Sequence, residues 1–126
     1  MDYNINFFVL KGQTIISLSQ DLDRIETDKG IYSVNHHQDC CESVCHIKTI
    51  GDYKSLIGKQ ITLAEDDRFE DDPDWYKEDK SYRDSYTWSK YVLEAEDGNE
   101  KVRVEFYYLG ESNGYYGETM SFDKLN

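Results

Sequence analysis

The sequence predicts an α+β fold made mainly of antiparallel β-sheet, with one short helix and a long acidic loop. Three observations lead to this prediction. The last third of the chain alternates apolar and charged residues, which is typical of a sheet with one face in water. Segments rich in β-branched residues are separated by turn sequences that contain Gly, Asn or Asp. The 126 residues include 11 Tyr, 5 Phe and 2 Trp, which is enough for the core of one domain, residues 1–126.

The first part of the chain predicts three strands. Thr14–Ser19 is rich in β-branched residues, which strands favour. Residues 23–28 and 31–35 flank the sequence Asp28-Lys29-Gly30, which predicts a hairpin turn because Gly adopts positive φ without steric cost. Val44–Ile50 alternates in side-chain type and predicts a further, half-buried strand.

The short helix is expected at Asp52–Leu56, as a single helical turn before Gly58 with Asp52 as its N-cap. A strand is expected at Gln60–Glu65. In the next segment, Glu65–Asp79, nearly all charged residues are Asp or Glu. This segment also contains the only proline of the chain. Because such a segment repels itself and resists packing, we expect a long exposed loop over about residues 65–80.

The last third predicts an antiparallel meander of three strands, Ser85–Glu94, Glu100–Leu109 and Tyr116–Asp123. The connections Glu96–Asn99 and Ser112–Gly114 contain the residue types that turns require. In the middle strand one face is apolar and the other is charged. The apolar face consists of Val102, Val104, Phe106 and Tyr108, and the charged face of Lys101, Arg103 and Glu105.

The charge of the chain narrows the classes of partner. A formal net charge of −12 argues against direct binding to nucleic acid and to anionic membranes, since both need Lys and Arg. The complementary partner is a basic protein, although an acidic balance also serves solubility alone. The sequence shows no apolar run long enough to span a membrane and no typical signal peptide. With an odd number of cysteines, we expect a cytoplasmic protein with thiols that are free or metal-bound.

All cysteines and histidines of the chain lie between His36 and His46. Thiolate and imidazole are the ligands that zinc prefers, so this cluster predicts a zinc site. A helix or an extended segment would each bring two or three of these side chains together. The spacing matches no standard zinc finger. The candidate ligands are His36, His37, Cys40, Cys41 and Cys45.

Two other interpretations of the cluster stay open. The cysteines could be ordinary buried residues, since free cysteine behaves as a small apolar side chain. A Cys–His nucleophile pair is chemically feasible, but the sequence shows no orienting third residue and no oxyanion donors. We therefore expect no enzyme and assign no catalytic residue. The aromatic sequences Tyr86-Thr87-Trp88 and Tyr115-Tyr116 predict cross-strand packing or, alternatively, an aromatic contact surface.

Four short sequences resemble an uncharacterised domain family of bacteria and tailed phages. They are His36-x-Gln38-Asp39-Cys40-Cys41-Glu42, Leu63-Ala64-Glu65, Tyr86-Thr87-Trp88 and Gly110-Glu111-Ser112-Asn113-Gly114-Tyr115-Tyr116. The resemblance covers roughly Thr14 to Asp123 and implies no established activity. If the paired-cysteine string marks ligands, the matching positions are His36, Cys40 and Cys41, and the remaining candidates are particular to this chain.

Small acidic phage proteins frequently inhibit host defence, and the chain is similar in this respect to zinc-containing anti-CRISPR proteins that block Cas9. The resemblance therefore implies a non-enzymatic inhibitor of a basic host protein, with a CRISPR effector such as Cas9 as one candidate. The alternatives are a metal- or thiol-dependent enzyme and an accessory phage or bacterial protein. The residues expected to present negative charge to the partner are Glu70, Asp71, Asp72 and Asp74.

Overall fold

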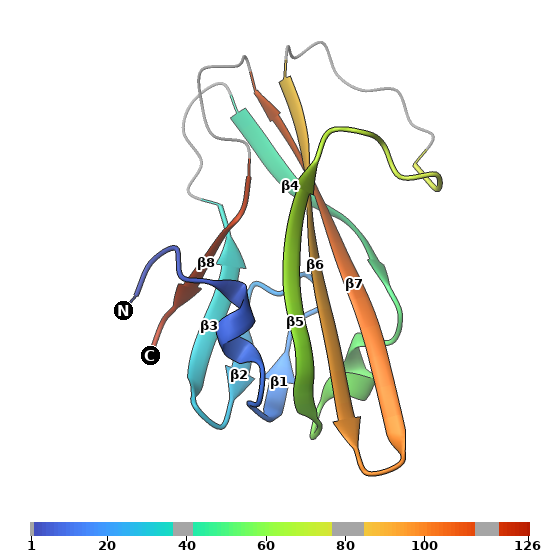
Figure 1. Ribbon diagram of the computed structural model, residues 1–126. Coiled ribbons are helices and arrows are strands. Elements are labelled where there is room, and N and C mark those ends of the chain that lie inside the picture. The colour runs from blue at the N-terminus through green and yellow to red at the C-terminus, as the bar shows by residue number, and fades with distance from the viewer. Residues whose placement is uncertain (1, 37–41, 77–84, 113–118) are drawn as a thin grey trace.

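The described part of the chain forms two antiparallel sheets of four strands each (Figure 1). The computed structural model describes residues 2–36, 42–76, 85–112 and 119–126. Sheet A has the strand order β1-β2-β3-β8, and sheet B has the order β4-β7-β6-β5. The strands are β1 (Ile15–Leu18), β2 (Ile25–Thr27), β3 (Gly30–Asn35), β4 (Glu42–Ile50), β5 (Gln60–Phe69), β6 (Ser85–Asp97), β7 (Glu100–Ser112) and β8 (Ser121–Lys124). The prediction of a mainly antiparallel sheet is confirmed.

The short predicted helix is a 3-10 turn. This turn, η2 (Tyr53–Leu56), is capped as expected, because the Asp52 side chain accepts a hydrogen bond from the backbone N–H of Lys54 at 3.2 Å. A second 3-10 turn, η1 (Phe7–Leu10), lies near the N-terminus. The described residues contain no α-helix. The hairpin expected around Asp28-Lys29-Gly30 is present as β2 and β3.

The expected meander of three C-terminal strands is only partly present. β6 and β7 form a long hairpin, as predicted, but β8 pairs with β3 in the other sheet. The second neighbour of β7 is β4, with Cys45 opposite Leu109 in the register. Because β4 already occupies that edge of β7, the last strand crosses to sheet A, where Phe122 stacks on Tyr32 with ring centroids 5.4 Å apart.

The acidic loop is shorter than predicted, because β5 continues to Phe69. The strand runs beyond Glu65 in regular register with β6, up to the pair Phe69 and Trp88. In this part of the strand Asp67 lies opposite Lys90, and Phe69 stacks on Trp88 with ring centroids 6.4 Å apart. Opposite charge across the strands and this ring contact offset the repulsion between neighbouring carboxylates.

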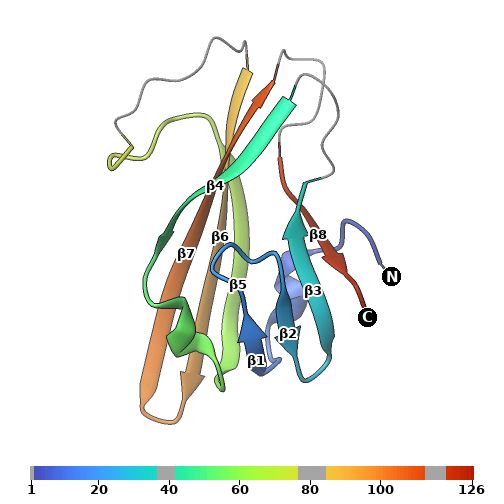
Figure 2. The same cartoon turned by 180° about the vertical axis from the view of Figure 1, so that it is seen from behind.

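The larger of two apolar clusters joins the two sheets, and η1 packs against it (Figure 2). Phe7 of η1 makes edge-to-face contacts with Tyr91 of β6 at 4.8 Å and with Phe122 of β8 at 5.0 Å. All three rings are buried. One aromatic residue therefore packs against both sheets at once, in the geometry that aromatic pairs prefer. The predicted apolar face of β7 points into this core.

The turn between β4 and η2 depends on a glycine. Gly51 has a φ of +106°, and a Cβ at this position would lie 2.7 Å from the backbone oxygen of Arg103 in β7. Gly12 has a similar φ of +93°, but nothing lies within 4 Å of its Cβ position. A substitution at either glycine strains the backbone, but only a substitution at Gly51 also causes a steric overlap.

We expect Gly51→Ala to destabilise the protein more than Gly12→Ala. Both substitutions force alanine into a left-handed conformation, which costs on the order of 1–3 kcal/mol. Only Gly51→Ala adds an overlap with the backbone of β7, which a strand within a sheet cannot relieve by a side-chain movement. Urea denaturation of both variants measures the difference. Equal losses would contradict the close approach of the turn to β7.

Candidate functional site

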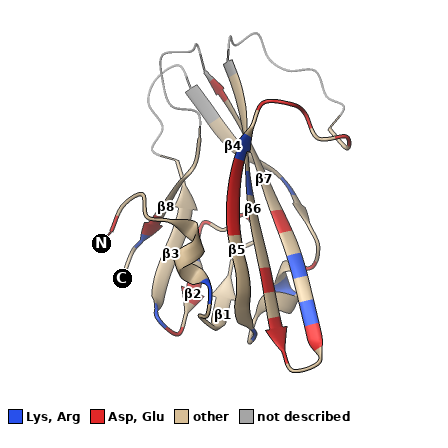
Figure 3. Ribbon diagram, in the orientation of Figure 1, with Lys and Arg blue, Asp and Glu red and all other residues tan. Residues whose placement is uncertain are grey.

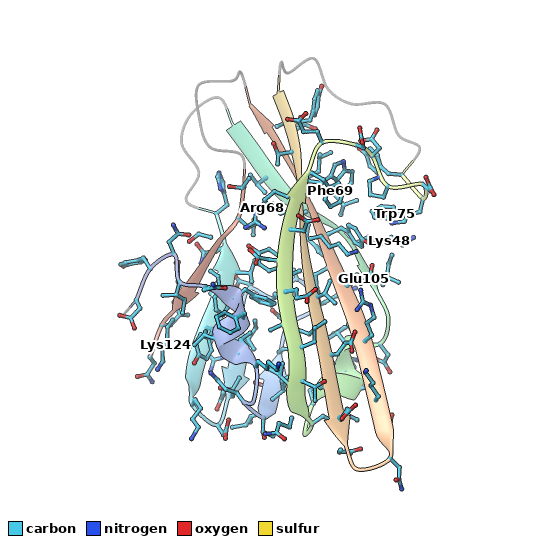
Figure 4. The ribbon with its side chains drawn as sticks, viewed as in Figure 1. Lys48, Arg68, Phe69, Trp75, Glu105 and Lys124 are labelled. Atoms are coloured by element: carbon cyan, nitrogen blue, oxygen red, sulfur yellow. The ribbon has the colours of Figure 1, made fainter. Side chains whose placement is uncertain are left out.

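The outer face of sheet B, which faces away from the core, buries apolar side chains at one end. Trp88 is fully buried there, and its neighbours Tyr107 and Leu109 in β7 are 7% and 3% exposed. We call this group, with the partly buried residues packed against it, the aromatic cluster (Figure 4). The partly buried residues are Ile47, Phe69, Trp75, Tyr76 and Tyr86.

The chain after β5 folds back over the aromatic cluster. Trp75 makes edge-to-face contacts with Trp88 at 5.7 Å and with Tyr107 at 5.0 Å, and Tyr76 contacts Trp88 in the same way at 4.9 Å. The indole N–H of Trp88 donates a hydrogen bond to Asp72 at 3.0 Å. We call residues 70–76 the acidic segment. Two aromatic side chains and one carboxylate fasten this segment to the sheet. The segment therefore covers Trp88.

The predicted partner-binding residues lie on this segment in two roles. Glu70, Asp71 and Asp74 are exposed, and none of them forms an ion pair within the described residues. Asp72 is exposed too, but it accepts the hydrogen bond from Trp88 and so has a structural role. Figure 3 shows that the acidic residues follow β5 and continue along the segment. The expectation that this stretch resists packing is therefore wrong for its aromatic residues.

Two lysines near the acidic segment lie against aromatic rings. The ammonium of Lys48 lies 4.9 Å from the centre of the Trp75 ring (Figure 4). That of Lys90 lies 5.6 Å from the Tyr107 ring and 3.6 Å from a carboxylate oxygen of Glu105. The Lys48 contact therefore holds a positive charge against a ring of the acidic segment, whereas the Lys90 contact holds one against the sheet. Within the described residues, neither lysine forms an ion pair with Glu70, Asp71 or Asp74.

Glu105 connects the cluster to a charged region farther along the sheet. It accepts a hydrogen bond from the Tyr107 hydroxyl at 2.6 Å. Burial, aided by this carboxylate, raises the pKa of Tyr107 to about 12. Arg103 binds both Glu105 at 3.2 Å and Glu94 at 2.6 Å. The hydrogen bond from Arg103 lowers the pKa of Glu94, so this region carries paired charges.

The predicted zinc ligands are only partly described. His37, Cys40 and Cys41 lie outside the described residues, so the prediction for them is untested. Within the described parts of the chain, no group of three or more His, Cys, Asp and Glu residues could hold a metal ion. Cys45 lies on the outer face of β4 and is exposed as a whole. Its sulfur is nevertheless partly shielded from water, and this desolvation, with the negative charge of Glu111, raises the pKa of the thiol. A raised pKa makes this thiol a poorer metal ligand and a poorer nucleophile.

His36 and His46 line one cavity of about 250 Å³ between the sheets, together with Asp21, Asp23 and Tyr108. The Nδ1 atom of His36 lies 2.9 Å from the backbone oxygen of Thr119. The Nε2 atom of His46 lies 2.7 Å from the Thr49 hydroxyl, and its ring packs edge-to-face on Tyr108.

Burial lowers the pKa of His46, although the negative charge of Asp21 opposes the shift. The imidazole is therefore neutral at pH 7. Cys45 and His46 point to opposite faces of β4, since neighbouring residues of a strand alternate. The two described candidate ligands, His36 and Cys45, therefore do not share a cavity, whereas His36 shares one with His46, which was not among the candidates.

Sequence reasoning missed the role of Trp75, Tyr76 and Phe69. The signal was present, because two adjacent aromatic residues interrupt an otherwise acidic stretch. Large aromatic side chains are mostly buried, so their presence argues against a fully exposed segment. Trp88 was expected to serve cross-strand packing or a contact surface, and the structure shows that it packs under the acidic segment.

The sequence profile of a domain of unknown function, DUF7448, matches residues 9–122. The chain therefore belongs to this family, which confirms its resemblance to an uncharacterised domain family. No curated protein and no solved structure matches the chain. Among the described residues, no helix is both long and apolar enough to cross a membrane.

We expect Asp72→Ala to destabilise the protein and to loosen the acidic segment. The variant leaves the buried N–H of Trp88 without its acceptor, which costs about 1–3 kcal/mol. Asp71→Ala removes the same charge from an exposed neighbour and serves as the matched control. Urea denaturation gives the free energy of unfolding, and Trp fluorescence reports on the cluster. Equal stability of the two variants would show that the hydrogen bond does not hold the segment.

Proposed function

We propose that the protein is a non-enzymatic binding protein that docks on a basic protein surface through its acidic segment. One observation carries this proposal. Asp72 and the two aromatic residues fasten the segment to the sheet, while Glu70, Asp71 and Asp74 face solvent without an ion pair among the described residues. The segment therefore presents its charge from a fixed position.

Fixing the segment before binding favours affinity and rate. A disordered acidic loop would lose conformational entropy on binding, whereas a segment already held on the sheet loses less. Because the chain as a whole carries a net charge of −12, its field attracts a basic partner over several ångströms of approach. Burial of a few carboxylates against Lys or Arg residues then sets the orientation of the complex.

Nucleic-acid-binding proteins supply basic surfaces of this kind. We propose a phage-type inhibitor of a host defence protein in the cytoplasm, with a CRISPR effector such as Cas9 as the specific candidate. Such effectors hold their heteroduplex in a positively charged channel, which an acidic protein can occupy. The family assignment carries no activity, so this proposal rests on charge and on the geometry of the acidic segment.

A zinc site is a separate part of the proposal. We expect purified protein to contain zinc, bound by ligands from the predicted set His36, His37, Cys40, Cys41 and Cys45. A structural zinc contributes on the order of 10 kcal/mol to folding, so a chelator should lower the melting temperature strongly. Elemental analysis and chelator-dependent melting measure both quantities, and Cys40→Ser should reduce the zinc content. Metal-free protein with an unchanged melting curve would contradict the zinc site.

The docking proposal is tested by removing charge without removing the fold. We expect Glu70→Gln/Asp71→Asn/Asp74→Asn to weaken binding to a basic partner by about tenfold or more, because exposed charges set the encounter and the orientation. Binding is measured by biolayer interferometry on purified Cas9 and on other basic nucleic-acid-binding proteins, at two salt concentrations.

The control is Glu96→Gln/Asp97→Asn/Glu100→Gln, which removes the same number of charges at the β6–β7 turn and with them the 3.9 Å ion pair between Glu100 and Lys59. That turn lies at the other end of sheet B from the acidic segment (Figure 1). The control variant should bind as the natural protein does. If both variants lose the same amount of binding, the loss reflects net charge and not the acidic segment, which would contradict the docking proposal. An absence of binding to every basic protein would overturn it as well.

A further inference from the structure

The free edge of β5 is only partly covered by the rest of the chain. β5 is the last strand of sheet B, and its first residues already have a backbone partner. Gly12 donates a backbone hydrogen bond to Ile61 at 2.7 Å, and Ile61 donates one to Gln13 at 2.8 Å. Before Gly12 the chain is coiled into η1, so no described backbone continues this pairing along Leu63–Phe69.

A bulge decides which backbone groups point to this edge. The register of β5 with β6 shifts between Ile61 and Leu63, which makes Thr62 an extra residue. Farther along, the N–H of Arg68 bonds to the side chain of Asp67 at 2.9 Å and so points away from β6. Because strand residues alternate, the backbone groups of Ala64 and Asp66 point to the same edge.

A groove of about 460 Å³ runs along this part of the edge, lined by Asn6, Phe8 and residues 64–67. Phe8 is 60% exposed. Within the described chain, Glu65 and Asp67 form no ion pair. The groove therefore combines backbone groups at a strand edge, an apolar ring and two carboxylates without an ion pair, of which Asp67 lies opposite Lys90 in the register.

Two cations also line the groove, but both are already paired. Lys90 lies 3.6 Å from a carboxylate oxygen of Glu105, and Arg103 lies 2.6 Å from one of Glu94. Their charge is directed to the outer face of β6 and β7. A basic ligand in the groove would therefore meet the carboxylates of β5 rather than free cations.

We propose that the edge of β5 from Ala64 to Arg68 binds an extended segment of the basic partner as an added strand. Backbone hydrogen bonds supply the attachment, and alternate side chains supply the specificity. Lys or Arg at every second position of the segment meets Glu65 and Asp67, which share the outer face. This inference rests on the proposed function, because the partner is the same, and it names the chain conformation that is recognised.

The test uses a short synthetic peptide in which Lys alternates with Val. We expect it to bind, and we expect N-methylation of one alternate set of residues to weaken binding by about tenfold, since only one set directs its N–H groups to β5. N-methylation of the other set should leave binding unchanged. In ¹⁵N-labelled protein, the amide signals of Ala64, Asp66 and Arg68 should shift and exchange more slowly with the first peptide bound.

Two variants of the protein test the edge from the other side. Asp66→Pro removes a backbone donor that points away from β6, so the strand should keep its pairing, and peptide binding should fall about tenfold. Asp66→Asn keeps the donor and removes the same charge, and it serves as the control. The two variants separate loss of the backbone donor from loss of the carboxylate.

The outcomes distinguish strand addition at the edge of β5 from docking through the acidic segment. If both N-methylated peptides bind as the parent peptide does, or if no peptide binds, the strand-addition proposal is overturned. Binding of Cas9 or another basic protein that depends on Glu70, Asp71 and Asp74 would then leave the proposed function standing. If Asp66→Asn loses as much binding as Asp66→Pro, the affinity comes from the carboxylate and not from the backbone donor, and the strand-addition proposal fails.

Discussion

The organisation of this protein depends on a strand pair that is buried on both faces. β6 places Tyr91 on the core side and Trp88 on the outer side, and both are fully buried. In a sheet with one face in water, the outer face would carry polar side chains and would need no cover. Here the outer aromatic cluster needs a cover, and the only chain that reaches it within the described structure is the acidic segment. The position of the carboxylates thus follows from the need to bury a tryptophan.

The sequence predicts the strands well where side-chain alternation is regular. The apolar and charged faces of β7 lie as the period-two pattern requires, and the capped turn at Asp52 is present. The sequence does not predict the partner of β8, since adjacency along the chain favours a hairpin while β4 already occupies the edge of β7. Sheet partners far apart in the sequence depend on tertiary packing, which local patterns do not record.

The site was harder to predict than the fold. Charge density alone indicated an exposed loop, and it gave no account of the aromatic residues that hold Glu70–Asp74 on the sheet. The cysteine and histidine cluster was conspicuous in the sequence, yet of its described members only His36 and His46 share a cavity. Spacing along a chain does not determine which face of a strand a residue occupies, and Cys45 and His46 illustrate this directly.

The extra residue at Thr62 has a consequence for how this domain can vary. Its hydroxyl reaches the backbone oxygen of Glu94 at 3.3 Å, and the bulge inverts the side-chain alternation of the ten-residue strand β5 from this point on. Because Ile61 pairs with Ala95 and Leu63 with Glu94, removal of this one residue would leave a regular ladder, with Ala64, Glu65 and Asp67 on the faces that they now occupy. A change of length by one residue between Leu63 and Phe69 would instead exchange the two faces of the strand, so β5 can vary in length at Thr62 but not beyond it.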